Sequence, residues 1–281
     1  MKKSELVLPA LILLSGNTPL VIGHRGYCAL APENTLPSFK LALEAGADLI
    51  ELDYHHSNDG VPLVFHDETL DRTTDSRKRW KRSHVKVSDK TAAEIQTLDA
   101  GSWFDTIFAG TKVPLLTEAL KFICDRGGVT LIEHKSGDAQ TLVQLLREQE
   151  MINRVVVISF DWKFLRQFHE LAPAQVLGAL GPPTHLANGR RPAGIFRRLT
   201  IRLLEELAKT GAKLAVWNRQ ISKLAVRLAH QRGLKVWIYT VDDRRLAARL
   251  LDVGVNGLIS NNPGLIRNVA TDYDDAAKTA H

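Results

Sequence analysis

The chain has 281 residues, of which 44% are hydrophobic and 24% are charged, a mixture typical of a globular protein with a sizeable core. Its two cysteines cannot form a disulfide framework, and no apolar run approaches the roughly 20 residues that span a bilayer. The formal net charge of +6 favours an anionic partner but does not by itself indicate nucleic acid.

The first residues raise the question of a signal peptide. Two lysines precede an apolar stretch at residues 6–14, which is the order of charge and hydrophobicity found in secretory signals. Glu5 in the basic region, Pro9 in the apolar stretch and the lack of a small-residue cleavage site argue against it. We therefore expect an N-terminal segment at 1–19 that caps the bottom of the fold, and a cytoplasmic protein. Secretion or export to the periplasm is the alternative.

From residue 20 onward, short apolar runs alternate with amphipathic stretches. The predicted strands are Leu20–Gly23, Leu49–His55, Val129–His134, Arg154–Ser159, Gln175–Ala179, Leu214–Trp217, Val236–Thr240 and Gly257–Ser260. The predicted helices are Asn34–Ala45, Leu115–Cys124, Ala139–Gln149, Trp162–Leu171, Ile201–Lys209, Ile221–Gln231 and Arg244–Leu251. This alternation predicts an α/β fold with a parallel sheet, and eight strands over this length predict a (β/α)8 TIM barrel. A doubly wound open sheet is the alternative.

Two stretches interrupt the alternation. Residues 67–112 are too many for an ordinary connection between a strand and its helix, so we expect an insertion after the second strand. Residues 182–199 form a second irregular stretch, rich in Gly, Pro and Arg. No linker separates two regions of different composition. We expect one barrel domain at 20–270, followed by a polar C-terminal tail at 271–281.

Two carboxylates lie two positions apart in the second predicted strand. Residues i and i+2 of a strand point to the same face, so Glu51 and Asp53 should project together into the mouth of the barrel. Burying both is costly unless a nearby charge compensates them, and a cation would do so. Glu133, near the end of the next strand, is a third candidate. Three carboxylates suit Mg²⁺ or Ca²⁺ better than zinc. Pairing with lysines or arginines of adjacent strands is the alternative.

Two histidines also follow strand ends, where catalytic residues of barrel enzymes lie. His24 follows the first predicted strand, and His66 ends a short extended piece. Imidazoles, with a pKa of about 6.5, can serve as a general acid and a general base near neutral pH. Arg25 offers a positive fork suited to phosphate oxygens, and Lys135, on the same face as Glu133, adds a second cation.

These residues fall within segments that resemble the motifs of the glycerophosphodiester phosphodiesterase family, in the same order. The matching segments are Gly23–Gly26, Ala31–Thr35, Glu51–Asp53, His66–Asp67, Leu70–Thr74, Asp99–Phe104, Val113–Leu120, Glu133–Lys135, Ser159–Asp161 and Ser260–Pro263. They extend over roughly residues 20–266, nearly the whole chain. Motifs of this length in this order argue against chance agreement.

The resemblance implies a (β/α)8 barrel with an insertion, and an enzyme that hydrolyses glycerophosphodiesters to glycerol 3-phosphate and an alcohol. In the family pattern, the acid–base pair corresponds to His24 and His66. The ligands of a divalent cation, Mg²⁺ or Ca²⁺, correspond to Glu51, Asp53 and Glu133. The phosphate contacts correspond to Arg25 and Lys135, and a motif beside the site corresponds to Glu33 and Asn34.

Two segments depart from the family pattern. A Glu-Ile-Lys of the family appears here as Glu133-His134-Lys135, and His134 should face away from Glu133. The family's Trp-Thr-Val-Asn appears here as Tyr239-Thr240-Val241-Asp242, so the first and last residues differ. An aromatic side chain is kept, so the resemblance implies that Tyr239 contacts the substrate. Packing in the core is the alternative for Tyr239.

The expected partner is a small-molecule glycerophosphodiester and not nucleic acid. A lysophospholipase D on the same barrel is one alternative, and a non-catalytic binding module is another. Two basic runs, at 77–82 with an aromatic residue and at 190–198, could give weak contact with a membrane surface, although a solvated face is the commoner meaning of such runs. The oligomeric state is left open.

Overall fold

The computed structural model describes residues 10, 16, 18–193 and 197–279, with the side chains of 276–279 left out. The predicted N-terminal segment at 1–19 falls mostly outside these residues and stays a prediction. The chain divides into two compact units. One comprises residues 1–20, 138–258 and 269–281, and the other comprises residues 21–137 and 259–268. We call them the C-terminal unit and the N-terminal unit.

The N-terminal unit is built on parallel strands. Strand β1 (Leu20–Gly23) pairs with β2 (Leu49–His56), and β2 pairs in turn with β4 (Val129–His134). These strands are rich in aliphatic residues and nearly all their side chains are buried, as expected for a parallel sheet covered on both faces. Helix α2 (Leu36–Glu44) follows β1, and α5 (Leu116–Cys124) precedes β4. The charged residues near the C-terminal ends of β2 and β4 are therefore exceptions in otherwise apolar strands.

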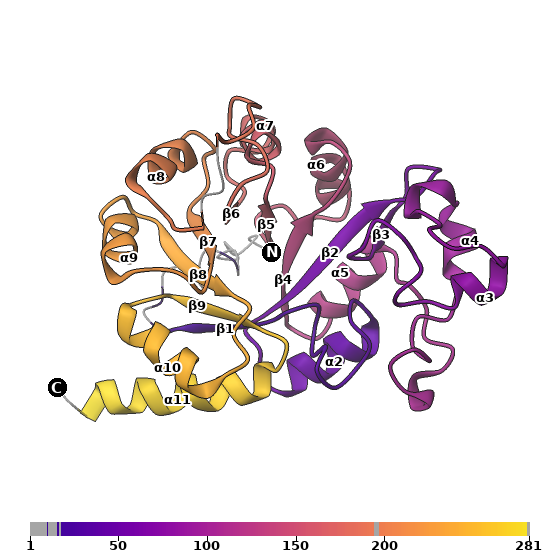
Figure 1. The fold of residues 1–281 in the computed structure, drawn as a ribbon, viewed down its shortest axis with the longest axis horizontal. Coiled ribbons are helices and arrows are strands. Elements are labelled where there is room, and N and C mark those ends of the chain that lie inside the picture. Colours follow the sequence, from indigo (N-terminus) through magenta and orange to yellow (C-terminus); the bar gives the residue numbers. More distant parts are fainter. Residues whose placement is uncertain (1–9, 11–15, 17, 194–196, 280–281) are drawn as a thin grey trace, which may run out of the picture. The chain divides into compact units, whose positions relative to one another are not determined.

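The predicted insertion lies between β2 and α5 in this unit (Figure 1). The short strand β3 (Pro62–Val64) precedes the predicted insertion at 67–112 and turns back antiparallel to the end of β2. Four short helical segments follow, namely α3 (Ser76–Trp80), η1 (Val87–Asp89), α4 (Ala92–Gln96) and η2 (Thr106–Phe108). They surround an apolar cluster of their own, with members such as Leu70, Val87, Ile95 and Leu98. The insertion is thus a packed layer and not an irregular loop.

The C-terminal unit carries the remaining strands, except that the last of them ends in the N-terminal unit. Strands β5 (Val155–Ser159), β6 (Leu177–Gly181), β7 (Leu214–Asn218), β8 (Lys235–Tyr239) and β9 (Gly257–Ser260) pair in sequence and in parallel. The helices are α6 (Ala139–Glu148), α7 (Trp162–Leu171), α8 (Ile201–Ala208), α9 (Lys223–His230) and α10 (Arg244–Val253) (Figure 1). Helix α11 (Pro263–Thr279) begins in the N-terminal unit and continues into the C-terminal unit from residue 269. Five of these helices are capped at the N-terminus by a side-chain oxygen that accepts a hydrogen bond from a backbone N–H of the first turn. The capping residues are Asp138, Asp161, Thr200, Ser222 and Asp243.

The element order agrees with the prediction. Eight parallel strands, each followed by a helix, are the elements of a (β/α)8 barrel. The strand predicted at Gln175–Ala179 begins two residues later, as β6 (Leu177–Gly181), and the Gln175 side-chain amide donates to the backbone carbonyls of Val155 and Val176. Helix α11 runs through residue 271, where the polar tail was predicted to begin. Among the described residues, no helix is both long and apolar enough to cross a membrane.

Candidate active site

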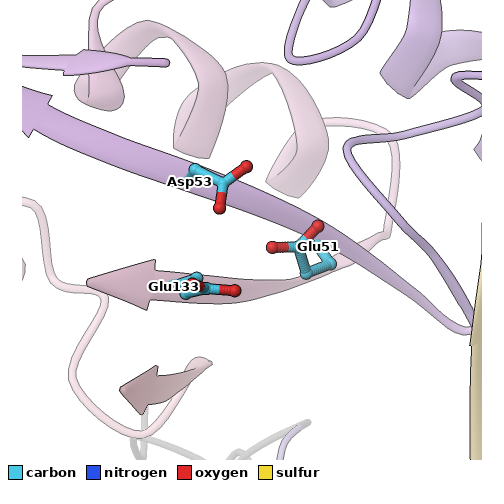
Figure 2. A group of neighbouring side chains, drawn as sticks. All are labelled: Glu51, Asp53 and Glu133. Carbon is cyan, nitrogen blue, oxygen red and sulfur yellow. The ribbon is translucent and has the colours of Figure 1, made fainter. Parts of the chain in front are cut away.

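Three carboxylates lie together at the C-terminal ends of β2 and β4. The register of the two strands places Asp53 directly beside Glu133, and Glu51 is two residues earlier on β2. One oxygen from each of the three lies within 4.8 Å of the others, and all three residues are buried. Figure 2 shows the three carboxylates grouped between the two strands from which they come. The predicted i, i+2 arrangement therefore brings these residues into a single cluster.

The cluster is electrostatically strained. Burial, followed by the charge of Asp53, raises the pKa of Glu51 and the pKa of Glu133, each to about 8. Burial would also raise the pKa of Asp53, but the charges of Lys135 and Arg25 lower it to about 2. In the absence of a further cation, Asp53 is thus the carboxylate that stays ionised and the glutamates hold protons up to neutral pH.

Two cations of the chain meet the cluster. Lys135 Nζ lies 3.0 Å from Asp53 Oδ1 and also pairs with Glu133 Oε1, so the lysine bridges β2 and β4. Arg25 Nε lies 3.4 Å from Asp53 Oδ2, and the backbone N–H of Arg25 donates to Glu51 Oε2 over 2.7 Å. Arg25 has a φ of 51°, an uncommon conformation for a residue other than glycine. The bond to Glu51 is one of the contacts that hold this turn after β1.

Asn34 and Glu33 lie in the turn that precedes α2, beside the cluster. Asn34 Nδ2 donates to Asp53 Oδ2 over 2.8 Å, and its Oδ1 accepts the backbone N–H of Asp53 over 3.2 Å. Asn34 has a φ of 58°, which asparagine tolerates better than most residues. Glu33 Oε1 accepts from Arg25 Nη1 over 2.8 Å. The two residues therefore hold Asp53 and Arg25 in place.

His24 follows directly after β1. Its Nδ1 donates to Asn261 Oδ1 over 2.6 Å, and the same oxygen accepts from the Cys28 thiol over 2.9 Å. Burial, followed by the positive charge of Arg25, lowers the pKa of His24 below its usual value. The ring is therefore neutral near pH 7, with Nε2 as the atom able to accept a proton.

His66 follows β3 at the start of the insertion. Its Nδ1 donates to Asp67 Oδ1 over 2.7 Å, and burial lowers the pKa of His66. Asp67 in turn accepts two bonds from Arg72. The two predicted acid–base residues thus share one arrangement. In each, Nδ1 donates to an oxygen acceptor, and Nε2 takes no part in that bond.

Residues 24–265 match the model of the "Glycerophosphoryl diester phosphodiesterase family". The chain belongs to this family. A glycerophosphodiester phosphodiesterase of Caldanaerobacter subterraneus subsp. tengcongensis is 34% identical over 261 residues, which are 89% of this chain and 97% of that protein. One of Bacillus subtilis is 32% identical over 283 residues, with 93% of this chain and 89% of that protein covered.

Solved structures of glycerophosphodiester phosphodiesterases give the same assignment. An Oleispira antarctica phosphodiesterase, determined in complex with the product sn-glycerol-3-phosphate, is 27% identical with a TM-score of 0.78 over 92% of this chain and 99% of that one. A glycerophosphodiester phosphodiesterase of Agrobacterium tumefaciens is 29% identical with a TM-score of 0.71 over 88% and 98%. The predictions of family, hydrolase class and (β/α)8 barrel are confirmed.

A divalent cation fits the cluster of three carboxylates. The donor set is all oxygen, which suits hard cations. Glu51 Oε1 is buried and has no hydrogen-bonding partner among the described residues, and such an atom is costly unless a cation or proton compensates it. Divalent-metal dependence is general in the family, and these three residues are the ones that would hold the metal.

Tyr239 lies at the end of β8, in the C-terminal unit. Its hydroxyl donates to the Gly181 carbonyl oxygen over 2.7 Å, and its ring packs edge-on against Phe160, with the ring centroids 6.0 Å apart. Its predicted contact with the substrate stays a prediction.

The sequence alone assigned no role to Asn261 and Asp67, which bind the two histidines, or to Arg72, which binds Asp67. Asn261, Asp67 and Arg72 each fall in a segment that matches the family, but the motif alone does not indicate what each side chain contacts. Arg72 binds Glu33 across 39 positions of sequence, and Asn261 binds His24 across 237. The one local signal was the adjacency of His66 and Asp67, an imidazole beside a carboxylate.

Proposed function

We propose that the chain hydrolyses glycerophosphodiesters to glycerol 3-phosphate and an alcohol, with His24 and His66 as the acid–base pair. The observation that carries this proposal is one carboxylate cluster at which Arg25 and Lys135 pair with Asp53, and whose Asp53 acts electrostatically on His24 and His66, two histidines that are each held at Nδ1. The Oleispira antarctica relative, with sn-glycerol-3-phosphate as its product, supports the same chemistry.

Arg25 and Lys135 serve as the phosphate-binding cations in this proposal. Both already lie against Asp53, so their charges are gathered at one point of the site. The guanidinium fork suits two phosphate oxygens, and the ammonium adds a point charge for the negative charge that builds up in the transition state. Glu33 and Asn34 orient Arg25 and Asp53 for this task.

His24 and His66 move the protons. One ring takes the proton from the nucleophile through Nε2, and the other donates a proton to the leaving alkoxide. Burial lowers the pKa of each ring, so the ring that serves as the base is neutral near pH 7, whereas the general acid acts from its imidazolium form, in which Nε2 carries the proton that passes to the leaving alkoxide. Mg²⁺ or Ca²⁺, when bound by Glu51, Asp53 and Glu133, supplies Lewis-acid stabilisation of charge on the phosphate oxygens.

The test is release of glycerol 3-phosphate from a panel of glycerophosphodiesters, measured after EDTA treatment and again with Mg²⁺ or Ca²⁺ added back. We expect no activity in chelator and recovery with one of the two cations, and the better cation identifies the cofactor. Full activity in chelator would contradict the metal assignment. Strong preference for lysophosphatidylcholine over glycerophosphocholine would favour a lysophospholipase D instead. Turnover of neither substrate by the metal-loaded protein would favour a non-catalytic binding module.

A further inference from the structure

Arg72 lies between two carboxylates of the N-terminal unit and binds each of them with two bonds. Its Nη1 and Nη2 donate to Glu33 Oε2 and Oε1 over 2.9 and 2.7 Å. Its Nε and Nη2 donate to Asp67 Oδ2 and Oδ1 over 2.6 and 3.0 Å. Only a planar guanidinium can satisfy two carboxylates in this way, because a lysine ammonium is a single point of charge.

Each of these carboxylates also holds a residue of the proposed site. Glu33 Oε1 accepts from Arg25 Nη1, and Asp67 Oδ1 accepts from His66 Nδ1. The five side chains therefore form one continuous chain, in which charges of opposite sign alternate from the phosphate-binding Arg25 to Asp67 and the last member is the proton-transferring His66. Arg72 is the middle member of this chain, and it touches neither end directly.

We propose that Arg72 is a positioning residue, which sets the orientation of His66 through Asp67 and that of Arg25 through Glu33. This inference rests on the proposed function, because it gives His66 and Arg25 the roles assigned there. Arg72 comes from the insertion and Glu33 from the turn before α2, so the insertion supplies part of the support of the site.

Electrostatics support this arrangement. The hydrogen bonds from Arg72 hold the pKa of Asp67 far below its usual range, so Asp67 is a carboxylate and can only accept. Nδ1 of His66 must then carry the hydrogen of their shared bond, which fixes the tautomer with Nε2 as the basic atom. Without Arg72, Glu33 and Asp67 would be two neighbouring carboxylates with no shared cation, and their repulsion would turn Asp67 away from His66.

The competing explanation is that Arg72 only fastens the insertion to the rest of the unit. Arg77 provides a matched control, because it is also an arginine of the insertion with an ion pair, 3.1 Å from Asp71, but its bonded partner holds no proposed site residue. The comparison uses Arg72→Ala, Arg72→Lys and Arg77→Ala in the full-length, metal-loaded protein. We expect Arg72→Ala to lower kcat about 10–100-fold, in the range usual for residues that orient catalytic groups, and Arg77→Ala to match the wild type.

The two branches of the network should separate in the kinetics. Asp67→Asn acts on His66 and should lower kcat with little change in KM, whereas Glu33→Gln acts on Arg25 and should mainly raise KM. Arg72→Ala should do both, and Arg72→Lys should recover only part of the loss. The double variant Asp67→Asn/Arg72→Ala should have a kcat no lower than that of the single variant with the lower kcat, because both changes break the same Arg72–Asp67–His66 interaction.

A spectroscopic measurement tests the same point without turnover. In protein labelled with ¹⁵N-histidine, the His66 signals, assigned with His66→Ala, should show the Nδ1–H tautomer in the wild type and in Arg77→Ala, and a mixture of tautomers in Arg72→Ala. Thermal unfolding of each variant reports whether the fold persists.

The outcomes are distinct. If the wild type is active but Arg72→Ala equals Arg77→Ala in kcat and tautomer, the positioning role is overturned and the proposed function stands. Additive losses in the double variant, or a loss of activity that matches a loss of folded protein, would also overturn it. If the wild type releases no glycerol 3-phosphate with either cation, the proposed function itself fails, and the positioning role fails with it.

Discussion

The two proposed catalytic histidines are held by different chemical groups. His24 Nδ1 donates to the neutral amide of Asn261, whereas His66 Nδ1 donates to the anionic Asp67. A carboxylate stabilises a protonated ring more than an amide does, so the two imidazoles differ in basicity although both are buried. An acid–base pair needs such a difference, because one ring must be ready to accept a proton while the other donates one.

Substitution of either histidine tests this pair. We expect His24→Ala and His66→Ala each to lower kcat by about 10²–10⁴-fold, the usual contribution of general acid–base catalysis. Circular dichroism should show that the fold persists, since both rings lie at strand ends and not in the apolar core. A rate near that of the wild type for either variant would remove that residue from the mechanism.

Lys135 competes with a bound cation for the carboxylates, because it pairs with both Asp53 and Glu133. We expect Lys135→Met to bind Mg²⁺ or Ca²⁺ more tightly, by about tenfold or more, since unit charges about 4 Å apart interact by ~4 kcal/mol at an effective dielectric constant of 20. The same variant should lose turnover, because a phosphate-binding charge is gone. Calorimetric titration with each cation measures the affinity.

Lys86→Met is the matched control for this experiment. Lys86 is ion-paired with Glu68 on the surface of the same unit, away from the carboxylate cluster. Its loss should leave cation affinity unchanged. An unchanged or weaker affinity in Lys135→Met would show that the lysine does not compete with the metal.

At this scale the sequence predicted the carboxylate cluster but not its supports. The side chains of Glu51 and Asp53 could be placed together because strand geometry alone fixes the faces of i and i+2. The partner of His24 could not be placed, because Asn261 reaches it through the fold from a distant position. Contacts between segments far apart in sequence depend on packing that no local pattern contains.

Among the elements, the insertion departs most from what its sequence indicated. Its length predicted an interruption of the barrel, but its short helices and separate apolar cluster were not predicted. A five-residue helix such as α4 is too short to show a clear amphipathic pattern. The longer strands and helices of the barrel could be predicted from the regular spacing of their apolar residues. Elements were therefore predicted well where they are long and regular.

The cluster inside the insertion can be tested by a core substitution. Ile95 is fully buried in it, whereas Ile107 in η2 is 79% exposed. We expect Ile95→Ala to lower the free energy of unfolding by about 2–5 kcal/mol, and Ile107→Ala to change it by less than about 0.5 kcal/mol. Urea titration measures both. Equal effects of the two substitutions would show that the insertion has no core of its own.

The basic run at 77–82 is less suited to a membrane than its composition indicated. Its aromatic residue, Trp80, packs against the apolar cluster of the insertion, and the Lys90 ammonium lies 4.6 Å from the centre of the Trp80 ring. The exposed part of the run is therefore charge without an aromatic anchor. Weak contact with an anionic surface stays a prediction that sedimentation with vesicles of anionic lipid would test.

For the whole molecule, the buried carboxylates link stability to pH. Raised pKa values near 8 for Glu51 and Glu133 mean that the folded, metal-free protein holds protons that the unfolded chain releases near pH 4.5. Their contribution to stability is complete below pH 4.5 and is lost as the pH rises towards 8. Buried histidines act in the opposite direction, but only below about pH 6.5, where the unfolded rings become charged.

We therefore expect the urea midpoint of the metal-free protein to fall as the pH rises from about 6.5 to about 8, and saturating Mg²⁺ or Ca²⁺ to restore it. Glu51→Gln should make the midpoint less dependent on pH, because an amide has no proton to lose. A midpoint of the metal-free wild type that rises through this range would show that the glutamates are ionised in the folded state.

The predicted placement in the cytoplasm also belongs to the whole molecule, but it depends on residues 1–19, which lie mostly outside the described part of the chain. Cell fractionation of the full-length protein would test it.

The proposed catalytic and cation-binding groups all belong to the N-terminal unit, residues 21–137 and 259–268, whereas Tyr239 belongs to the other. This division offers a plan for recombination. A chimaera could join this unit to the segment of another family member that corresponds to residues 138–258. It would take its phosphate chemistry from this chain and the ends of strands β5–β8 from the other protein. If those strand ends select the alcohol, the head-group preference would differ from one chimaera to the next, while the proposed catalytic and cation-binding residues stayed the same.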